Sequence, residues 1–265
     1  MTPFPDERRP THPDQPGAPA SPAAQFLAAL ADPACGPVDA ERAALVVAHP
    51  DDESIGCGAQ LPRLRGLTVV HVTGAGPRLE ELDAAMALAG VPAARRLVLG
   101  YADGGVPERI SDIAKNLAGL FAERGIAVAL THAWEGGHSD HDAVALAVAG
   151  ARRLLGPDRL GVVEMPYYHA GPDGFEAGGF LSAVPPRRAI ALHLDPDDCA
   201  LKAALFAAHA SQAETLNRMP IALERFREAP EPDFSALPNG GRVLYDGPGF
   251  LARARAAGRA LGIGG

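Results

Sequence analysis

The stretch AALVVA at residues 43–48 is followed without a break by HPDDE at residues 49–53. Six consecutive apolar residues are typical of a short strand that is covered on both faces. Runs of the same kind recur along the chain, and we predict strands at Leu67–Thr73, Arg96–Leu99, Ile126–Thr131, Gly161–Met165 and Ala189–Leu194. The chain therefore places a series of short buried strands one after another.

Segments of helix length separate these strands. We predict helices at Gly58–Arg65, Leu79–Ala89, Ile110–Glu123, Asp142–Leu155 and Pro196 to about Ala210, with shorter helices at Gln25–Ala31 and Phe250–Leu261. Alternation of strands and helices indicates an α/β fold. We therefore expect a Rossmann-like, mostly parallel sheet with helices on both faces.

The two ends of the chain differ in character from its middle. Residues 1–22 contain seven prolines among polar residues, and such a segment cannot bury enough apolar surface to offset the entropy of ordering it. We predict a disordered tail over residues 1–22 and a single domain over residues 23–265. Its last part, from about Glu214, is expected to be an irregular C-terminal extension.

The composition excludes several classes of function. The net charge is −8 and aromatic residues make up only 5%, which disfavours binding of nucleic acid through basic or stacking side chains. No apolar run reaches the roughly 18 residues that a membrane helix needs. Cys35, Cys57 and Cys199 cannot all pair, and the N-terminal residues lack the apolar core of a secretory signal. We therefore expect a reduced, cytoplasmic protein.

Polar side chains follow the first strand at the point where it ends. His49, Asp51 and Asp52 lie there, and in an open parallel sheet ligands bind at this end of the strands. Neighbouring carboxylates repel each other unless a cation or a proton lies between them. A helix cap is the simpler interpretation, but a cap needs only one such residue. The cluster therefore favours a divalent metal.

A second polar cluster follows the fourth strand, at residues 131–142 (THAWEGGHSDHD). His138 and His141 are three residues apart at the start of a predicted helix, so they share one face. Asp140 lies between them and can orient a neighbouring imidazole. We expect this cluster to face the first one across the sheet edge.

Together the two clusters contain a two-histidine, one-carboxylate set formed by His49, Asp52 and His141. Three protein ligands with an open position are the form of a catalytic zinc site, and the same set also suits Fe(II). Asp51 remains as a base beside the metal, and His138 remains as an acid or a cation across the site.

These motifs resemble the PIG-L/LmbE family of metal-dependent N-acetylglucosaminyl deacetylases. The similarity extends from about Arg42 to Met219. Besides the two clusters it includes an Arg-x-x-Glu helix that starts at Arg78, the loop Asp103-Gly104-Gly105, and the His-x-Ser-Gln motif at residues 209–212.

The resemblance implies a role for each matching residue. His49, Asp52 and His141 match the metal ligands, and Asp51 matches the general base. His138 matches the group that stabilises the oxyanion or protonates the amine, with Asp140 supporting it. The sugar-contacting positions are matched by Arg78 and Asp103. The implied activity is removal of the acetyl group of a small N-acetylated sugar by metal-activated water, with zinc or Fe(II) as cofactor.

Three alternatives remain at this point. The chain could hydrolyse a non-sugar amide, or bind a sugar on the same fold without catalysis. It could also bind a nucleotide, although the glycines at residues 56–58 and 74–76 do not complete Gly-x-Gly-x-x-Gly. His71 is expected to pack inside its strand, and His132 could support the site. His209 and Gln212 are expected near the site without an assignable role, and the oligomeric state stays open.

Overall fold

A seven-stranded sheet forms the centre of the protein, and the computed structural model describes residues 20–32, 36–182 and 187–263. Five neighbouring strands of this sheet are parallel to one another. The two remaining strands lie at one edge and join the sheet through antiparallel pairings. In spatial order the strands are β10 (Ala189–His193), β11 (Leu223–Glu228), β7 (Gly161–Met165), β6 (Val128–His132), β2 (Ala43–Val47), β4 (Thr68–Thr73) and β5 (Arg96–Tyr101). The predicted mostly parallel α/β fold is confirmed.

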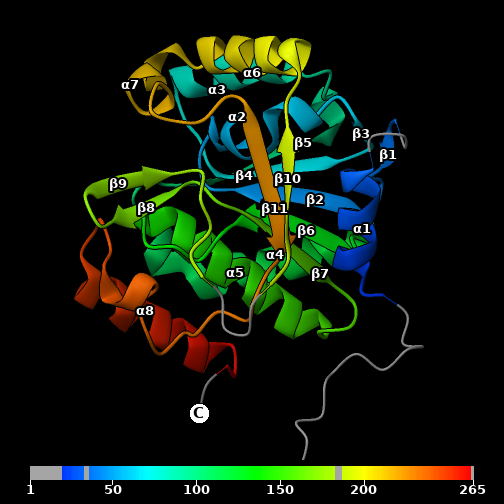
Figure 1. Cartoon of the computed structure of the whole chain (residues 1–265). Helices are drawn as coiled ribbons and strands as arrows, with labels where there is room; N and C mark the ends of the chain where they lie inside the picture. The colour runs from blue at the N-terminus through cyan, green and yellow to red at the C-terminus, as the bar shows by residue number, and fades with distance from the viewer. Residues whose placement is uncertain (1–19, 33–35, 183–186, 264–265) are drawn as a thin grey trace, which may run out of the picture.

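Helices cover both faces of this sheet (Figure 1). One face carries α1 (Pro22–Ala31), α2 (Asp52–Cys57), α3 (Pro77–Leu88) and α6 (Pro196–Ala208), and the other carries α4 (Ile110–Arg124), α5 (Ser139–Leu155) and α8 (Gly247–Ala260). Alternate residues of β2 serve the two faces: Leu45 and Val47 enter the first core, and Ala44 and Val46 enter the second. This double burial explains why β2 is apolar throughout.

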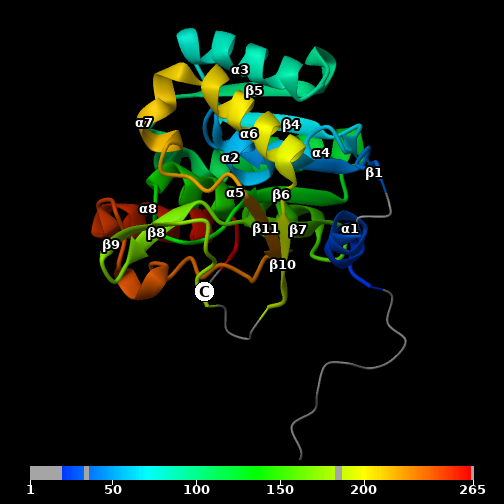
Figure 2. The same cartoon turned by 45° about the horizontal axis from the view of Figure 1, so that its top comes forward.

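Smaller elements surround the sheet. A short parallel pair joins β1 (Val38–Asp39) to β3 (Leu64–Arg65), and β8 (Tyr168–Gly171) forms an antiparallel hairpin with β9 (Gly174–Ala177). Figure 2 shows α6 beside α3, with α7 (Ala213–Leu216) following α6 at one end. Short 3-10 turns occupy Gly58–Gln60, Ala93–Arg95, Val106–Arg109, Ala210–Gln212 and Asn239–Gly241.

The prediction of a helix at Gly58–Arg65 is wrong. The helix α2 ends at Cys57, a 3-10 turn follows at Gly58–Gln60, and Leu64–Arg65 pair with β1. The helix lies earlier in the sequence than predicted, since it begins at Asp52 within the polar motif itself. The lysine Lys202 of α6 donates to the carbonyl of Ile55 at 2.9 Å and so satisfies a group at the end of the helix.

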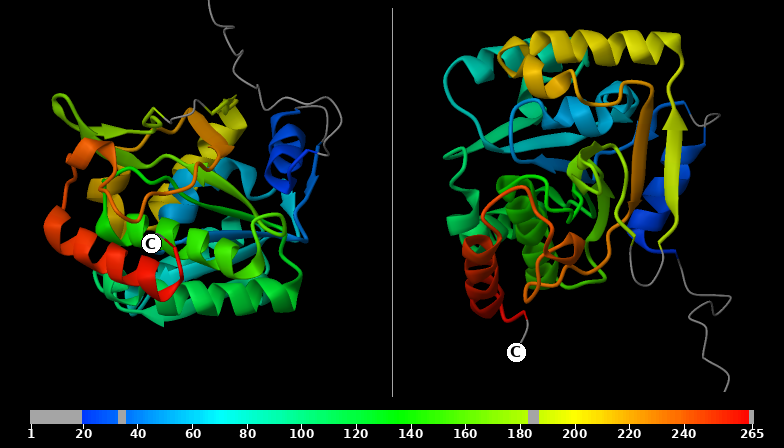
Figure 3. Two further views of the ribbon diagram at one scale, coloured as in Figure 1. Left: turned by 90° about the horizontal axis from the view of Figure 1, so that it is seen from below. Right: turned by 60° about the vertical axis from the view of Figure 1, so that its left-hand side comes forward.

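The ends of the chain also differ in detail from the expectation. Of the predicted tail, residues 1–19 lie outside the described residues, and α1 begins at Pro22 with Ser21 as its N-cap. The terminal helix α8 packs against α4 and α5 (Figure 3). Within the described ranges, no helix combines the length and apolar character needed to cross a membrane.

Candidate functional site

The loop after β2 turns sharply at Asp51. This residue has φ 127° and ψ −29°, a conformation that residues with a side chain rarely adopt. The helix α2 starts directly after it, and the Asp52 carboxylate accepts a hydrogen bond from the backbone N–H of His49 at 2.7 Å. As a result His49, Asp51 and Asp52 are all buried beneath one short turn.

The loop after β6 is held by a carboxylate at the start of α5. Asp142 accepts hydrogen bonds from the backbone N–H groups of Glu135 and Gly136 and from the hydroxyl of Tyr245 at 2.6 Å. Gly137 has no room for a side chain, since a Cβ there would lie 1.9 Å from the carbonyl oxygen of Tyr168. The loop therefore presents His138 in a defined position.

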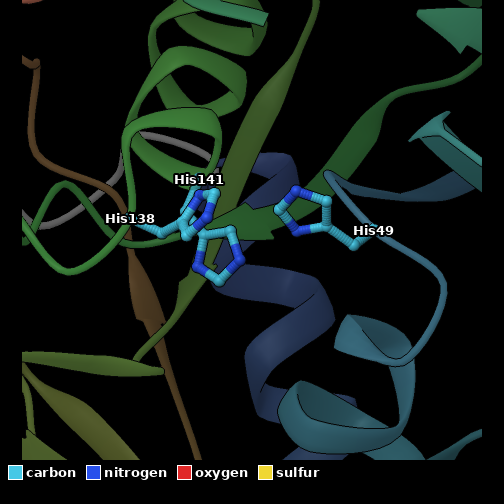
Figure 4. Close-up of side chains that lie close together, drawn as sticks. All are labelled: His49, His138 and His141. Atoms are coloured by element: carbon cyan, nitrogen blue, oxygen red, sulfur yellow. The ribbon is translucent and has the colours of Figure 1, made fainter. Parts of the chain in front are cut away.

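Three imidazoles, that of His49 from the loop after β2 and those of His138 and His141 from the start of α5, point toward one another (Figure 4). The ring centroids of His49 lie 4.9 Å from those of His138 and 5.3 Å from those of His141. Asp52 joins the group, because its Oδ2 lies 3.3 Å from Nδ1 of His49 and its Oδ1 lies 3.1 Å from Nε2 of His141. The structure thus brings the three predicted ligands together.

Ligand atoms that could share one metal ion fall into overlapping groups. His49, His138 and His141 form one such group within 4.8 Å, and Asp52, His132 and His141 form another. His132 differs from the others because its Nε2 already accepts the backbone N–H of Ala48 at 2.9 Å. Its ring stacks on His141 with centroids 4.1 Å apart, so it supports that ring.

Asp140 contacts two imidazoles, one through its carboxylate and the other through its backbone N–H. Its Oδ2 lies 3.2 Å from Nε2 of His49 and accepts the N–H of Gly104 at 2.7 Å. Toward His138 it uses its backbone N–H, which donates to Nδ1 at 3.1 Å. The carboxylate thus supports His49, where the resemblance implied support of His138. The backbone contact leaves the ring proton of His138 on Nε2.

Arg78 and Asp103 form one rim of the site. The guanidinium of Arg78 lies 2.9 Å from Oδ2 of Asp103 and 3.3 Å from Oδ1 of Asp51. It also donates to the carbonyl of Pro50 at 3.1 Å. Asp103 in turn places Oδ1 3.3 Å from Nε2 of His49. Both residues predicted to contact the sugar therefore lie beside the predicted base and the histidines.

The electrostatics of the cluster are those of a site rich in carboxylates. Burial, together with the neighbouring charge of Asp52, raises the pKa of Asp51 well above its usual range. Burial and the adjacent imidazoles of His141 and His49 lower the pKa of His138 to about 4, so this ring is neutral near pH 7. Oδ1 of Asp140 is buried without a hydrogen-bond partner among the described residues. A cation placed here would relieve the repulsion between Asp51 and Asp52.

A cavity of about 160 Å³ opens over these residues. Tyr168 of β8, Gln212 at the end of the 3-10 turn before α7, and Thr215 of α7 complete its wall. The sequence offered a partial signal for two of them, since Tyr168 follows a predicted strand and Gln212 belongs to the His-x-Ser-Gln motif. No local pattern marks Thr215, which only the packing of α7 brings to the site.

Comparison with known proteins places these features in a family. Residues 44–151 match the model of the PIG-L family, described as GlcNAc-PI de-N-acetylase. Three solved deacetylase structures share the fold: the A40926 pseudoaglycone deacetylase (16% identity, TM-score 0.54, covering 72% of this chain and 97% of that one), a teicoplanin deacetylase complex (15%, 0.53, 72% and 100%) and a zinc-inhibited teicoplanin deacetylase (14%, 0.51, 70% and 97%).

Sequence comparison finds fewer similar proteins than structural comparison does. No curated protein matches the chain at a significant level. The family match nevertheless covers both loops of the site and the strands that carry them. Residues 44–151, which contain His49, Asp52, His138 and His141, therefore match the model of the PIG-L family, and the resemblance found in the sequence is confirmed.

Proposed function

We propose that the protein is a metal-dependent N-deacetylase that releases acetate from a small N-acetylated sugar. The observation that carries the proposal is the convergence of His49, Asp52 and His141 beside Asp51 in one polar cavity. The match to the PIG-L family supports the reaction, and the deacetylases that share the fold support an N-acetyl substrate.

The donor set fits a divalent metal. Two imidazoles and a carboxylate are ligands that zinc and Fe(II) accept, and we assign them to His49, His141 and Asp52. The zinc-inhibited form reported for one fold neighbour supports metal binding in this fold. When bound, the cation supplies a positive charge that acidifies water and polarises a carbonyl group.

The residues of the chain itself then move the protons. Asp51 accepts a proton from the water as its oxygen attacks the acetyl carbon. The Nε2–H group of His138 donates to the developing oxyanion, which its neutral state and its fixed tautomer permit. The C–N bond breaks as Asp51 passes the proton it accepted to the amine nitrogen, and the products are a free amine and acetic acid, which ionises to acetate.

Substrate contact is assigned to the rim. Arg78 and Asp103 lie on the open side of the cavity, and the side chain of Asp103 is 58% exposed. Their hydrogen-bonding groups can meet the hydroxyls of a sugar ring. Since the charge of Arg78 is already balanced by Asp103 and Asp51, a neutral sugar suits this rim.

We also propose that residues 23–265 form a single domain that includes the C-terminal extension. Tyr245 reaches Asp142 at 2.6 Å, and the backbone N–H of Leu244 donates to the carbonyl of Gly136 at 2.9 Å. These contacts join the extension to the loop that carries His138. A fragment that ends before the extension should therefore lose activity together with cooperative unfolding.

The substrate class is tested by amine release. Metal-loaded protein is incubated with a panel of N-acetylglucosaminides and with N-acetylated amines that carry no sugar. We expect free amine from the sugar panel only. Equal turnover of the non-sugar amides would show a broader amidohydrolase, and binding of the sugars without amine release would show a non-catalytic sugar-binding protein.

A further inference from the structure

A second cluster of ionisable groups lies buried behind the site. Glu53, His71 and His209 come from α2, β4 and the end of α6, and none of their side chains is exposed to solvent. The Nε2 atoms of both histidines lie 2.9 Å from the Glu53 carboxylate, His71 on Oε2 and His209 on Oε1. The catalytic scheme above uses none of the three.

The carboxylate of Glu53 is fully surrounded by donors. Besides the two imidazoles, the hydroxyl of Ser54 donates to Oε1 at 2.7 Å and the backbone N–H of Asp51 donates to Oε2 at 2.9 Å. Burial alone would raise the pKa of Glu53, but the hydrogen bonds from His209 and His71 lower it far below its ordinary range. Because an ionised carboxylate only accepts, each histidine presents a protonated Nε2 to it.

One of these hydrogen bonds fixes the turn that carries the base. The donor of the bond from Asp51 N–H to Glu53 is the residue whose backbone has the positive φ of 127°. Such a conformation is strained and persists only when surrounding contacts hold it. His71 donates to the same oxygen, Oε2, and so fixes the acceptor in turn.

The cluster also reaches the opposite wall of the cavity. His209 is followed directly by the 3-10 turn Ala210–Gln212 and by α7, which supply Gln212 and Thr215 to the lining. Glu53 therefore connects the turn of Asp51 to the segment that faces the substrate. A contact between Ser211 and Glu81 of α3 anchors the same segment from the outside.

We propose that Glu53 is a positioning residue that holds Asp51 in its strained conformation, with His71 and His209 as the groups that fix Glu53. The inference rests on the proposed deacetylase function in that Asp51 is taken as the base. The structural part of the proposal is that the Asp51 turn depends on Glu53, and this dependence can be measured without an activity assay.

The test is a double-mutant cycle between Glu53→Gln and Asp51→Asn. Loss of the Glu53 carboxylate should lower kcat at least about tenfold with KM changed by less than about threefold, because misplacing a catalytic group mainly affects the chemical step. In the Asp51→Asn background the same change should lower the residual kcat by less than about twofold. An equal loss in both backgrounds, or an unchanged kcat in the single variant, would overturn the proposal.

Glu224→Gln serves as the matched control. Glu224 is another buried carboxylate, with Lys202 at 2.9 Å, and it lies away from Asp51 on β11. Its replacement tests whether any disturbed buried charge lowers kcat. A loss of kcat in folded Glu224→Gln as large as that of Glu53→Gln would assign the effect to general destabilisation.

Two measurements keep the proposal testable if activity or folding fails. Hydrogen exchange of the Asp51 amide should be slow in the wild type and much faster in Glu53→Gln, whether or not the protein deacetylates the substrates offered. If Glu53→Gln does not fold, His71 gives the milder comparison. His71→Gln retains a donor and should keep kcat, whereas His71→Leu should lose it; equal kcat values in these two variants would contradict the proposal.

Discussion

Oδ1 of Asp52 lies 3.1 Å from Nε2 of His141, and this contact joins the loop after β2 to the first turn of α5. The two residues are 89 positions apart in sequence and meet because β2 and β6 are adjacent and parallel. The opposite oxygen of Asp52 faces His49. One buried carboxylate thus bridges two imidazoles, which is the arrangement that a divalent metal would replace with its own bonds.

Replacement of His141 by Ala should remove most of the bound metal. The change deletes one of three proposed ligands and leaves Asp52 facing an open space. Metal content per chain is measured by elemental analysis after gel filtration. His193→Ala, in the exposed part of β10, is the control and should keep its metal. Full occupancy in the His141 variant would remove that residue from the ligand set.

Replacement of Asp51 by Asn should keep the metal and lower kcat by about 10²–10⁴-fold, the usual contribution of a general base. The side chain sits beside Arg78 and next to Asp52, without being one of the proposed ligands. Steady-state kinetics and metal analysis are made on the same sample. A metal-loaded variant with nearly normal kcat would show that another group takes the proton.

Replacement of His138 by Ala should lower kcat by about 10²–10³-fold, as expected for loss of one oxyanion donor. His138→Gln retains a donor and should recover part of the rate. Metal content should change little in either variant, because His141 and His49 remain. A large loss of metal in His138→Ala would instead make this residue a ligand, in line with its place in the three-imidazole group.

Removal of the Tyr245 hydroxyl should destabilise the protein by about 1.5–3 kcal/mol, the range for a hydrogen bond to a charged group. Its oxygen donates to Asp142 at 2.6 Å, and Asp142 holds the loop before His138. Urea unfolding of Tyr245→Phe at pH 8 measures the change. Tyr101→Phe removes a hydroxyl from an exposed contact with Asn116 and should cost about 1 kcal/mol or less.

The contribution of Glu135 to the stability of the protein should fall as the pH rises from about 4.5 to 7. Burial raises the pKa of Glu135 to about 7, although His169 lies near one of its oxygens. Between these pH values the unfolded chain releases a proton that the folded protein keeps, so unfolding is favoured by up to about 3 kcal/mol. Glu135→Gln should show a flatter curve of unfolding free energy against pH.

The same comparison in a His169→Gln background assigns the effect. The pKa of His169 is itself raised, chiefly by its hydrogen bond with Glu135, so its titration overlaps the same range. If the wild-type and Glu135→Gln curves remain parallel from pH 4.5 to 7 in both backgrounds, Glu135 is not the group that titrates.

Four of the five parallel strands, β2, β4, β6 and β7, could be predicted from sequence because they are buried on both faces, whereas the edge strand β5 is only partly buried. The segment Gly161–Met165, which is apolar apart from Glu164, predicts β7 with its observed bounds. The strand β11 could not be found in this way, since LERFRE carries four charged residues. Its Arg227 is buried beside Glu164 of β7, which pairs with it at 2.5 Å and lies 63 residues away in sequence.

In the candidate site, too, some features could be predicted from sequence and others could not. His49, Asp52 and His141 could be placed together because they follow adjacent strands at one sheet edge. The partnership of Glu53 with His209 spans 156 residues and depends on how α6 ends beside α2, so no spacing rule predicts it. The role of Asp140 was found only in part, because which group faces which imidazole is decided by the first turn of α5.

The central claim is tested most directly by adding metal back to chelator-treated protein. Amine release from an N-acetylglucosaminide is followed while zinc or Fe(II) is titrated in. We predict no turnover before addition, a rise with increasing metal, and a plateau at one ion per chain that Asp51→Asn fails to reach. Full turnover by metal-free protein, or none at any metal concentration with any N-acetylated sugar, would contradict the account.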